Sequence, residues 1–131
     1  MTATRTQTYA RRAYTCIEAV KGTPIEKKYG ALALSFPVMV LKNGLAQATG
    51  FLLAKAKDEH IAYLNDLARV LNGVDGNADG NSPGQALHRT IIATDLTAYQ
   101  RYTRNTLDAA AWMKRYAQGL LKAEATDGDQ Q

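Results

Sequence analysis

Apolar side chains along this chain recur mainly at intervals of three and four residues, the spacing of one face of an α-helix. Tyr9, Ala13 and Ile17 show this spacing near the N-terminus, and Leu64 and Leu67 show it in the middle of the chain. No segment alternates apolar and polar positions while being rich in β-branched residues, so strands are not expected. The periodic segments predict helices over residues 4–21, 25–42, 45–57, 58–71, 83–94 and 96–123.

Capping and helix-breaking residues set the boundaries of these segments. Ser82 and Pro83 pair a capping side chain with a proline suited to a first helical turn, and Gly22 favours the end of a helix. The segment 25–42 is apolar on nearly all sides, so we expect it to be the central helix. Pro37 lies within it and lacks a backbone N–H, so we expect a kink or a division into two short helices there.

These elements predict an all-α, single-domain helical bundle of about five to seven helices. The length of 131 residues and the hydrophobic content of 46% suit one domain with one core. We expect this domain to span residues 1–123 and the polar tail 124–131 to be disordered. In the last two helices, Ile92 and Leu96 are expected to face the core.

The chain has no apolar run approaching the roughly 20 residues needed to cross a bilayer, and its N-terminus lacks the apolar segment of a secretory signal. We therefore expect a cytoplasmic protein with no membrane partner. Its single cysteine, Cys16, cannot form an internal disulfide, which fits a reducing compartment. Cys16 is on the apolar face of the first helix and is interpreted as a small hydrophobic residue.

The segment between the fourth and fifth expected helices partly matches a calcium-binding loop. Asp75, Asn77, Asp79 and Gly80 occupy positions one, three, five and six of an EF-hand loop, but position twelve is Ala86 instead of a glutamate. A turn rich in Asp, Asn and Gly explains the same residues without calcium.

Neither enzymatic nor metal-binding motifs are evident. His60 and His88 lack the spacing of a zinc site and are expected to be surface histidines. Nucleophile-elbow, phosphate-loop and dinucleotide-binding motifs are absent from the sequence. We expect no catalytic residue, metal site or cofactor.

Charge is distributed unevenly along the chain. Residues 1–57 hold nine Lys or Arg against two acids, a balance of +7, whereas residues 58–131 hold seven against ten, a balance of −3. A positive half favours an anionic partner, either a nucleic acid or an acidic protein. Such cations favour binding to a nucleic-acid backbone, because each phosphate that they neutralise releases condensed counterions.

The segment 27–55, KKYGALALSFPVMVLKNGLAQATGFLLAK, narrows this choice. Its order of KKY, SFP, NGL, a Phe-Leu pair and a closing Lys resembles the small subunit family of type III-B CRISPR effector complexes, the Cmr complexes. Arg5, Tyr9 and Tyr14 in the first helix are similar to that family as well. Thr49 and Gly50 depart from the family pattern, in which larger or more helix-favouring residues are expected.

This resemblance implies a subunit without nuclease activity that stacks with copies of itself and with other Cmr-complex subunits along guide RNA and target RNA. Basic helix faces of that family line the RNA channel, which implies RNA contacts for Arg5, Arg11, Arg12, Lys21, Lys27, Lys28, Lys42 and Lys55. Phe36, Pro37, Leu45 and Phe51 are interpreted as core or helix-junction residues. The alternative is a helical interaction module that assembles with acidic proteins without touching RNA.

Overall fold

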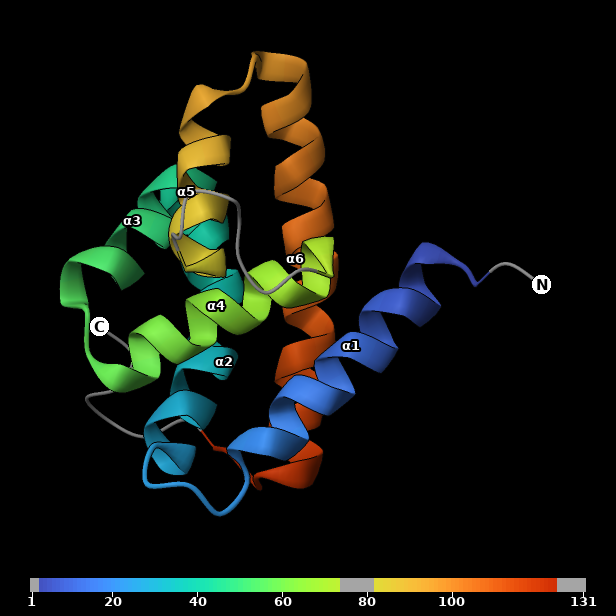
Figure 1. Ribbon diagram of the computed structural model, residues 1–131, viewed down its shortest axis with the longest axis vertical. Helices are drawn as coiled ribbons and strands as arrows, with labels where there is room; N and C mark the ends of the chain where they lie inside the picture. The colour runs from blue at the N-terminus through green and yellow to red at the C-terminus, as the bar shows by residue number, and fades with distance from the viewer. Residues whose placement is uncertain (1–2, 74–81, 125–131) are drawn as a thin grey trace.

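The computed structural model describes residues 3–73 and 82–124, and these residues form α-helices and connecting turns without a strand. Six helices follow one another, which confirms the predicted all-α bundle (Figure 1). Their bounds are α1 Arg5–Val20, α2 Glu26–Asn43, α3 Leu45–Lys55, α4 Asp58–Asn72, α5 Pro83–Ala93 and α6 Leu96–Leu120. No helix in these ranges is both long and apolar enough to span a membrane.

Side-chain caps fix the starts of three helices. Thr4 begins α1 with a capping box, in which its hydroxyl accepts from the Gln7 N–H at 3.1 Å and the Gln7 side chain accepts from the Thr4 N–H at 2.9 Å. Ser82 caps α5 ahead of Pro83, as the sequence predicts, and Asp95 caps α6. These caps satisfy backbone donors that a helix leaves open in its first turn.

Of the two outcomes expected at Pro37, a kink or a division of the helix, the division does not occur. α2 continues through Pro37 to Asn43 and ends at Gly44, whose positive φ of 89° suits glycine. Pro37 cannot donate to the carbonyl of Ala33, but Ala33 and Phe36 are fully buried on the helix face beside it. Tertiary packing on that face holds the helix together across the lost hydrogen bond.

The central helix is α4, and the prediction that gave this place to the second helix was wrong. α4 packs against each of the other five helices, whereas α2 packs mainly against α3, α4 and α6 (Figure 1). α2 consequently leaves Val38 and Leu41 exposed, at 51% and 71% of their surface. α4 also buries polar residues, namely Glu59, His60 and Asp66.

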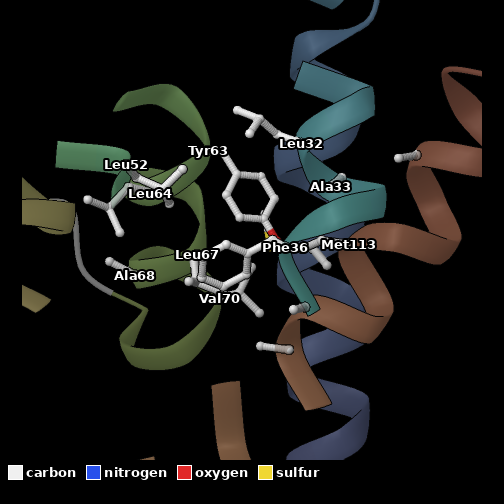
Figure 2. Packing of buried hydrophobic residues seen from close by; sticks show 14 of the residues in the cluster. Leu32, Ala33, Phe36, Leu52, Tyr63, Leu64, Leu67, Ala68, Val70 and Met113 are labelled. Carbon is white, nitrogen blue, oxygen red and sulfur yellow. The ribbon is translucent and has the colours of Figure 1, made fainter. Parts of the chain in front are cut away.

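The core lies between α4 and its neighbours (Figure 2). The ring of Tyr63 from α4 packs against Phe36 of α2 at 5.2 Å between centroids and against Tyr29 at 5.6 Å. Leu67 from α4 and Met113 from α6 are fully buried in the same cluster. Leu, Phe, Tyr and Met side chains of several helices thus interdigitate around α4.

A buried polar network crosses this core. The Tyr29 hydroxyl donates to Asp66 Oδ2 at 2.6 Å, and Arg69 donates to Asp66 Oδ1 at 2.8 Å. Burial raises the pKa of Asp66, while the bonds from Tyr29 and Arg69 act in the opposite direction. Within the described part of the chain the Tyr63 hydroxyl is buried without a hydrogen-bond partner.

The inward orientation predicted for Ile92 and Leu96 was wrong. These side chains are 61% and 71% exposed, on either side of the connection at the top of Figure 1 where α5 ends and α6 begins. The fully buried residues of α6 begin only at Thr106, more than one-third of the way along the helix. Helical spacing identifies an apolar stripe, but it does not show how far along a helix the neighbouring elements extend.

Candidate nucleic-acid interface

Three lysines from separate elements surround one hollow in the surface. Lys28 comes from α2, Lys55 from the last turn of α3, and Lys57 from the residue that precedes α4. The hollow has a volume of about 260 Å³ and also contains Glu59, so the charged groups around it sum to +2. All three lysines are exposed. This concentration of positive charge suits a phosphate group.

A left-handed residue brings Lys55 and Lys57 together. α3 ends at Lys55, and Ala56 adopts φ 55° and ψ 17°, which turns the chain before α4 begins. The sequence predicted a helix through residue 57, in which side chains two positions apart point to different sides. Lys57 was not among the predicted contacts, and no Gly or Asn marked the turn that places it here.

An aromatic ring and a buried imidazole are among the groups that line the hollow. Phe51 packs edge-on against His60 at 5.8 Å between centroids, and the Lys55 ammonium lies over the Phe51 ring at 5.8 Å. His60 is only 9% exposed, so its prediction as a surface histidine was wrong. Its Nδ1 lies 3.4 Å from Glu59 Oε2 and forms no hydrogen bond with the described residues. Burial lowers the pKa of His60, so the imidazole is neutral at pH 7.

The remaining predicted lysines lie apart from this hollow. Lys27 lines a second hollow of about 500 Å³ with Lys122, but Glu26 and Glu124 line it too and balance the charge. Lys21 follows the last residue of α1, and Lys42 lies in the last turn of α2. Both are exposed, as is Arg11 on α1.

Two predicted arginines already have partners within the protein. Arg5 forms an exposed ion pair with Asp108 of α6 at 3.3 Å. Arg12 was a predicted RNA contact, but its Nη1 donates to the Val70 carbonyl at 3.1 Å near the end of α4. A cation at that position satisfies an open carbonyl and complements the helix dipole. Arg12 therefore joins α1 to α4.

The described residues do not bring metal ligands together. Among residues 3–73 and 82–124, no group of three His, Cys, Asp or Glu side chains could hold a metal ion. Asp75, Asn77, Asp79 and Gly80 of the calcium-loop comparison lie outside the described residues. Ala86 lies in α5. Cys16 packs against the core, half-buried, as its apolar position predicts.

Comparison with known proteins identifies the family. The family described as "CRISPR-associated protein (Cas_Cmr5)" matches residues 5–120. The chain belongs to the Cmr5 family. It is 39% identical over 120 residues to the CRISPR system Cmr subunit Cmr5 of Thermus thermophilus, covering 91% of this chain and 97% of that one. The crystal structure of a CRISPR-associated Cmr5 family protein from the same organism superposes with a TM-score of 0.80 at 35% identity, covering 91% and 98% of the two chains.

The predicted Cmr small-subunit resemblance is thereby confirmed, and both of its departures, Thr49 and Gly50, lie beside His88. Thr49, fully buried in α3, lies with its hydroxyl 2.7 Å from Nδ1 of His88 in α5. A Cβ at Gly50 would stand 3.5 Å from the His88 ring. The departures at 49 and 50 are thus linked to a histidine on the neighbouring helix. Phe36 and Leu45 are core residues as interpreted, whereas Phe51 is half-buried and lines the lysine hollow.

Proposed function

We propose that this Cmr5-family chain is a non-catalytic small subunit of a type III-B effector complex and that it holds guide or target RNA by the phosphate backbone. Lysines at the α2–α3–α4 hollow are its principal contacts. Base pairing between the two RNAs supplies sequence choice, while the cations supply position and affinity.

One observation carries this proposal: the hollow keeps a net positive charge, because its three lysines face only one acidic side chain, Glu59. Among the described residues the ion pairs join Arg5 to Asp108 and Arg69 to Asp66, and neither these pairs nor the His60–Glu59 contact involves a lysine. Lys28, Lys55 and Lys57 therefore retain their charge for an external anion. Arg11, Lys21, Lys27 and Lys42 are exposed and extend the positive surface, whereas Arg12 has a structural bond.

The same proposal includes stacking against copies of the chain and other Cmr subunits. Val38 and Leu41 on α2, and Ile92 and Leu96 at the α5–α6 connection, are large apolar side chains left exposed. Apolar surface of this kind is buried in stable assemblies. Phosphate contacts and subunit contacts would then use different parts of the bundle surface.

Salt dependence of RNA binding tests the proposal. Changing Lys28, Lys55 and Lys57 together to Gln should weaken binding to single-stranded RNA by roughly tenfold to a hundredfold, because each exposed ionic contact contributes up to about 1 kcal/mol. The slope of log K against log salt should also become shallower by about 2, because each of the three phosphate contacts contributes about 0.7 to it.

A matched control removes equal charge elsewhere. Lys21, Lys27 and Lys42 changed to Gln should affect RNA binding less, since none of them lines the lysine hollow. Equal losses in both triple variants would contradict the assignment of the hollow. Wild-type binding that did not respond to salt would overturn RNA-backbone binding altogether. Loss of subunit assembly in the Lys28, Lys55 and Lys57 variant, together with no RNA binding by the wild-type chain, would favour the protein-only alternative.

A further inference from the structure

The lysine hollow has a chemical composition that backbone binding alone does not require. Besides the three lysines, Phe51 and Met39 line it, and Ser35 and His60 contribute polar groups. A site for bare phosphate would need the cations only. An aromatic ring combined with a few polar groups is typical of a pocket for a planar ligand.

His60 supplies an independent indication of a ligand. Its side chain is about nine-tenths buried, it lines the hollow, and its Nδ1 has no hydrogen-bond partner within the described residues. Buried polar atoms of this kind normally have a partner, and one without a partner costs about 1–3 kcal/mol. In the neutral form each ring nitrogen either donates or accepts one hydrogen bond, so Nδ1 can bond one polar group of a ligand.

The start of α4 adds a place for the phosphate. Lys57 is the residue that precedes the helix, and its side chain makes no capping hydrogen bond. Backbone N–H groups in an uncapped first turn, together with the helix dipole, attract an anion. Because Lys57, Glu59 and His60 all line the hollow, this helix end lies at its edge.

We infer that the hollow is a nucleotide pocket, which takes one RNA base out of the strand and holds its phosphate at the rim. The phosphate lies among Lys28, Lys55 and Lys57, and the base packs over Phe51 beside Met39. Lys55 leaves the Phe51 ring, where its ammonium now lies, and moves to the phosphate. The volume of about 260 Å³ is slightly below the roughly 300 Å³ of small-ligand pockets and limits the site to one nucleotide. This inference rests on the proposed RNA binding and states how the hollow holds one nucleotide.

Photo-crosslinking tests the pocket without altering the protein. A short single-stranded RNA carrying 4-thiouridine is bound to the full wild-type chain and irradiated, and the crosslinked residue is located by peptide mass spectrometry. We expect the crosslink on Phe51 or Met39. RNA that binds with the expected salt dependence but crosslinks only outside the hollow would overturn the pocket and leave backbone binding standing. RNA that does not bind would overturn both.

A pair of variants gives a second readout. Phe51→Ala should weaken RNA binding about fivefold to a hundredfold, the effect of removing a stacking partner, and should leave the salt slope unchanged. Lys28→Gln should instead make the slope shallower, and Lys27→Gln, its neighbour outside the hollow, should change both the affinity and the slope less than Lys28→Gln does. Thermal melting of each variant separates loss of binding from loss of folding. A folded Phe51→Ala variant with wild-type affinity would contradict the pocket.

Discussion

The two buried tyrosines of the core provide a sharp test of how the fold is held together. Tyr29 and Tyr63 are both 0% exposed, and their rings pack 5.6 Å apart. The Tyr29 hydroxyl donates to Asp66, whereas the Tyr63 hydroxyl has no partner in the described part of the chain. Replacing each tyrosine by Phe removes the same oxygen atom from the same cluster. The two variants should nevertheless differ in stability.

Tyr29→Phe should lower the free energy of unfolding by about 1.5–3 kcal/mol, the usual contribution of a hydrogen bond to a charged group. Asp66 is only 8% exposed, so water cannot readily replace the lost donor. With an unfolding entropy of about 2.1 cal/mol/K per residue, the melting temperature of this 131-residue chain should fall by about 5–11 °C. Tyr63→Phe should leave stability unchanged or raise it by about 1 kcal/mol, because it removes a buried hydroxyl that bonds to nothing.

The loss in Tyr29→Phe should depend on pH. Burial raises the pKa of Asp66 above its ordinary value of 3.8, so its contribution to stability is greatest below that value and declines as pH rises through the folded pKa. The Tyr29 hydrogen bond opposes this rise, and removing it raises the pKa of Asp66 further. The difference between Tyr29→Phe and wild type should therefore be larger near pH 7 than near pH 4.

Urea unfolding followed by circular dichroism at both pH values measures these differences. A double-mutant cycle with Asp66→Asn isolates the pair, since Tyr29→Phe should cost less in that background. Equal destabilisation by Tyr29→Phe and Tyr63→Phe would refute the reasoning, because ring packing would then account for both effects. A Tyr29→Phe loss that did not change with pH would exclude an ionised Asp66 as the acceptor.

Two further pairs of variants test backbone geometry. Ala56→Gly should stabilise the protein by about 0.5–1 kcal/mol, because Ala56 has a left-handed φ of 55°. Ala54→Gly inside α3 should destabilise it by a similar amount. Thermal melts should therefore show shifts of opposite sign for the two variants. Gly84→Ala should destabilise by about 1–3 kcal/mol, because its Cβ would lie 2.6 Å from Leu64 Cγ, while Gly119→Ala meets no atom within 4 Å and should be neutral or stabilising. If calorimetry gave Gly84→Ala and Gly119→Ala the same stability, this result would contradict the close contact between α4 and α5.

Much of the secondary structure was predictable because its causes are local. The caps at Ser82 and Asp95 are side chains that bond their own helix within three residues, so they act wherever the helix lies. Pro37 shows what local reasoning left open. A proline removes a backbone donor in any context, but only the packing of Phe36 and Ala33 determines whether the helix continues past it.

The candidate site was predictable in its charge and not in its geometry. Lys28 and Lys55 were among the expected contacts because cations are visible in any sequence. Their meeting across α2 and α3, with Lys57 as a third member, depends on the turn at Ala56 and on the docking of α4. Arg12 carries the same charge as these lysines, but it bonds the Val70 carbonyl within the protein.

The sequence by itself determined the helical class, most helix boundaries, the uneven charge and the family likeness, since periodicity, capping and residue order are properties of neighbours along the chain. Only the tertiary structure decided that α4 is central, that His60 is buried, and that three lysines surround one hollow. The physical reason is that burial and electrostatic proximity depend on distances between segments far apart in sequence, and helix packing sets those distances.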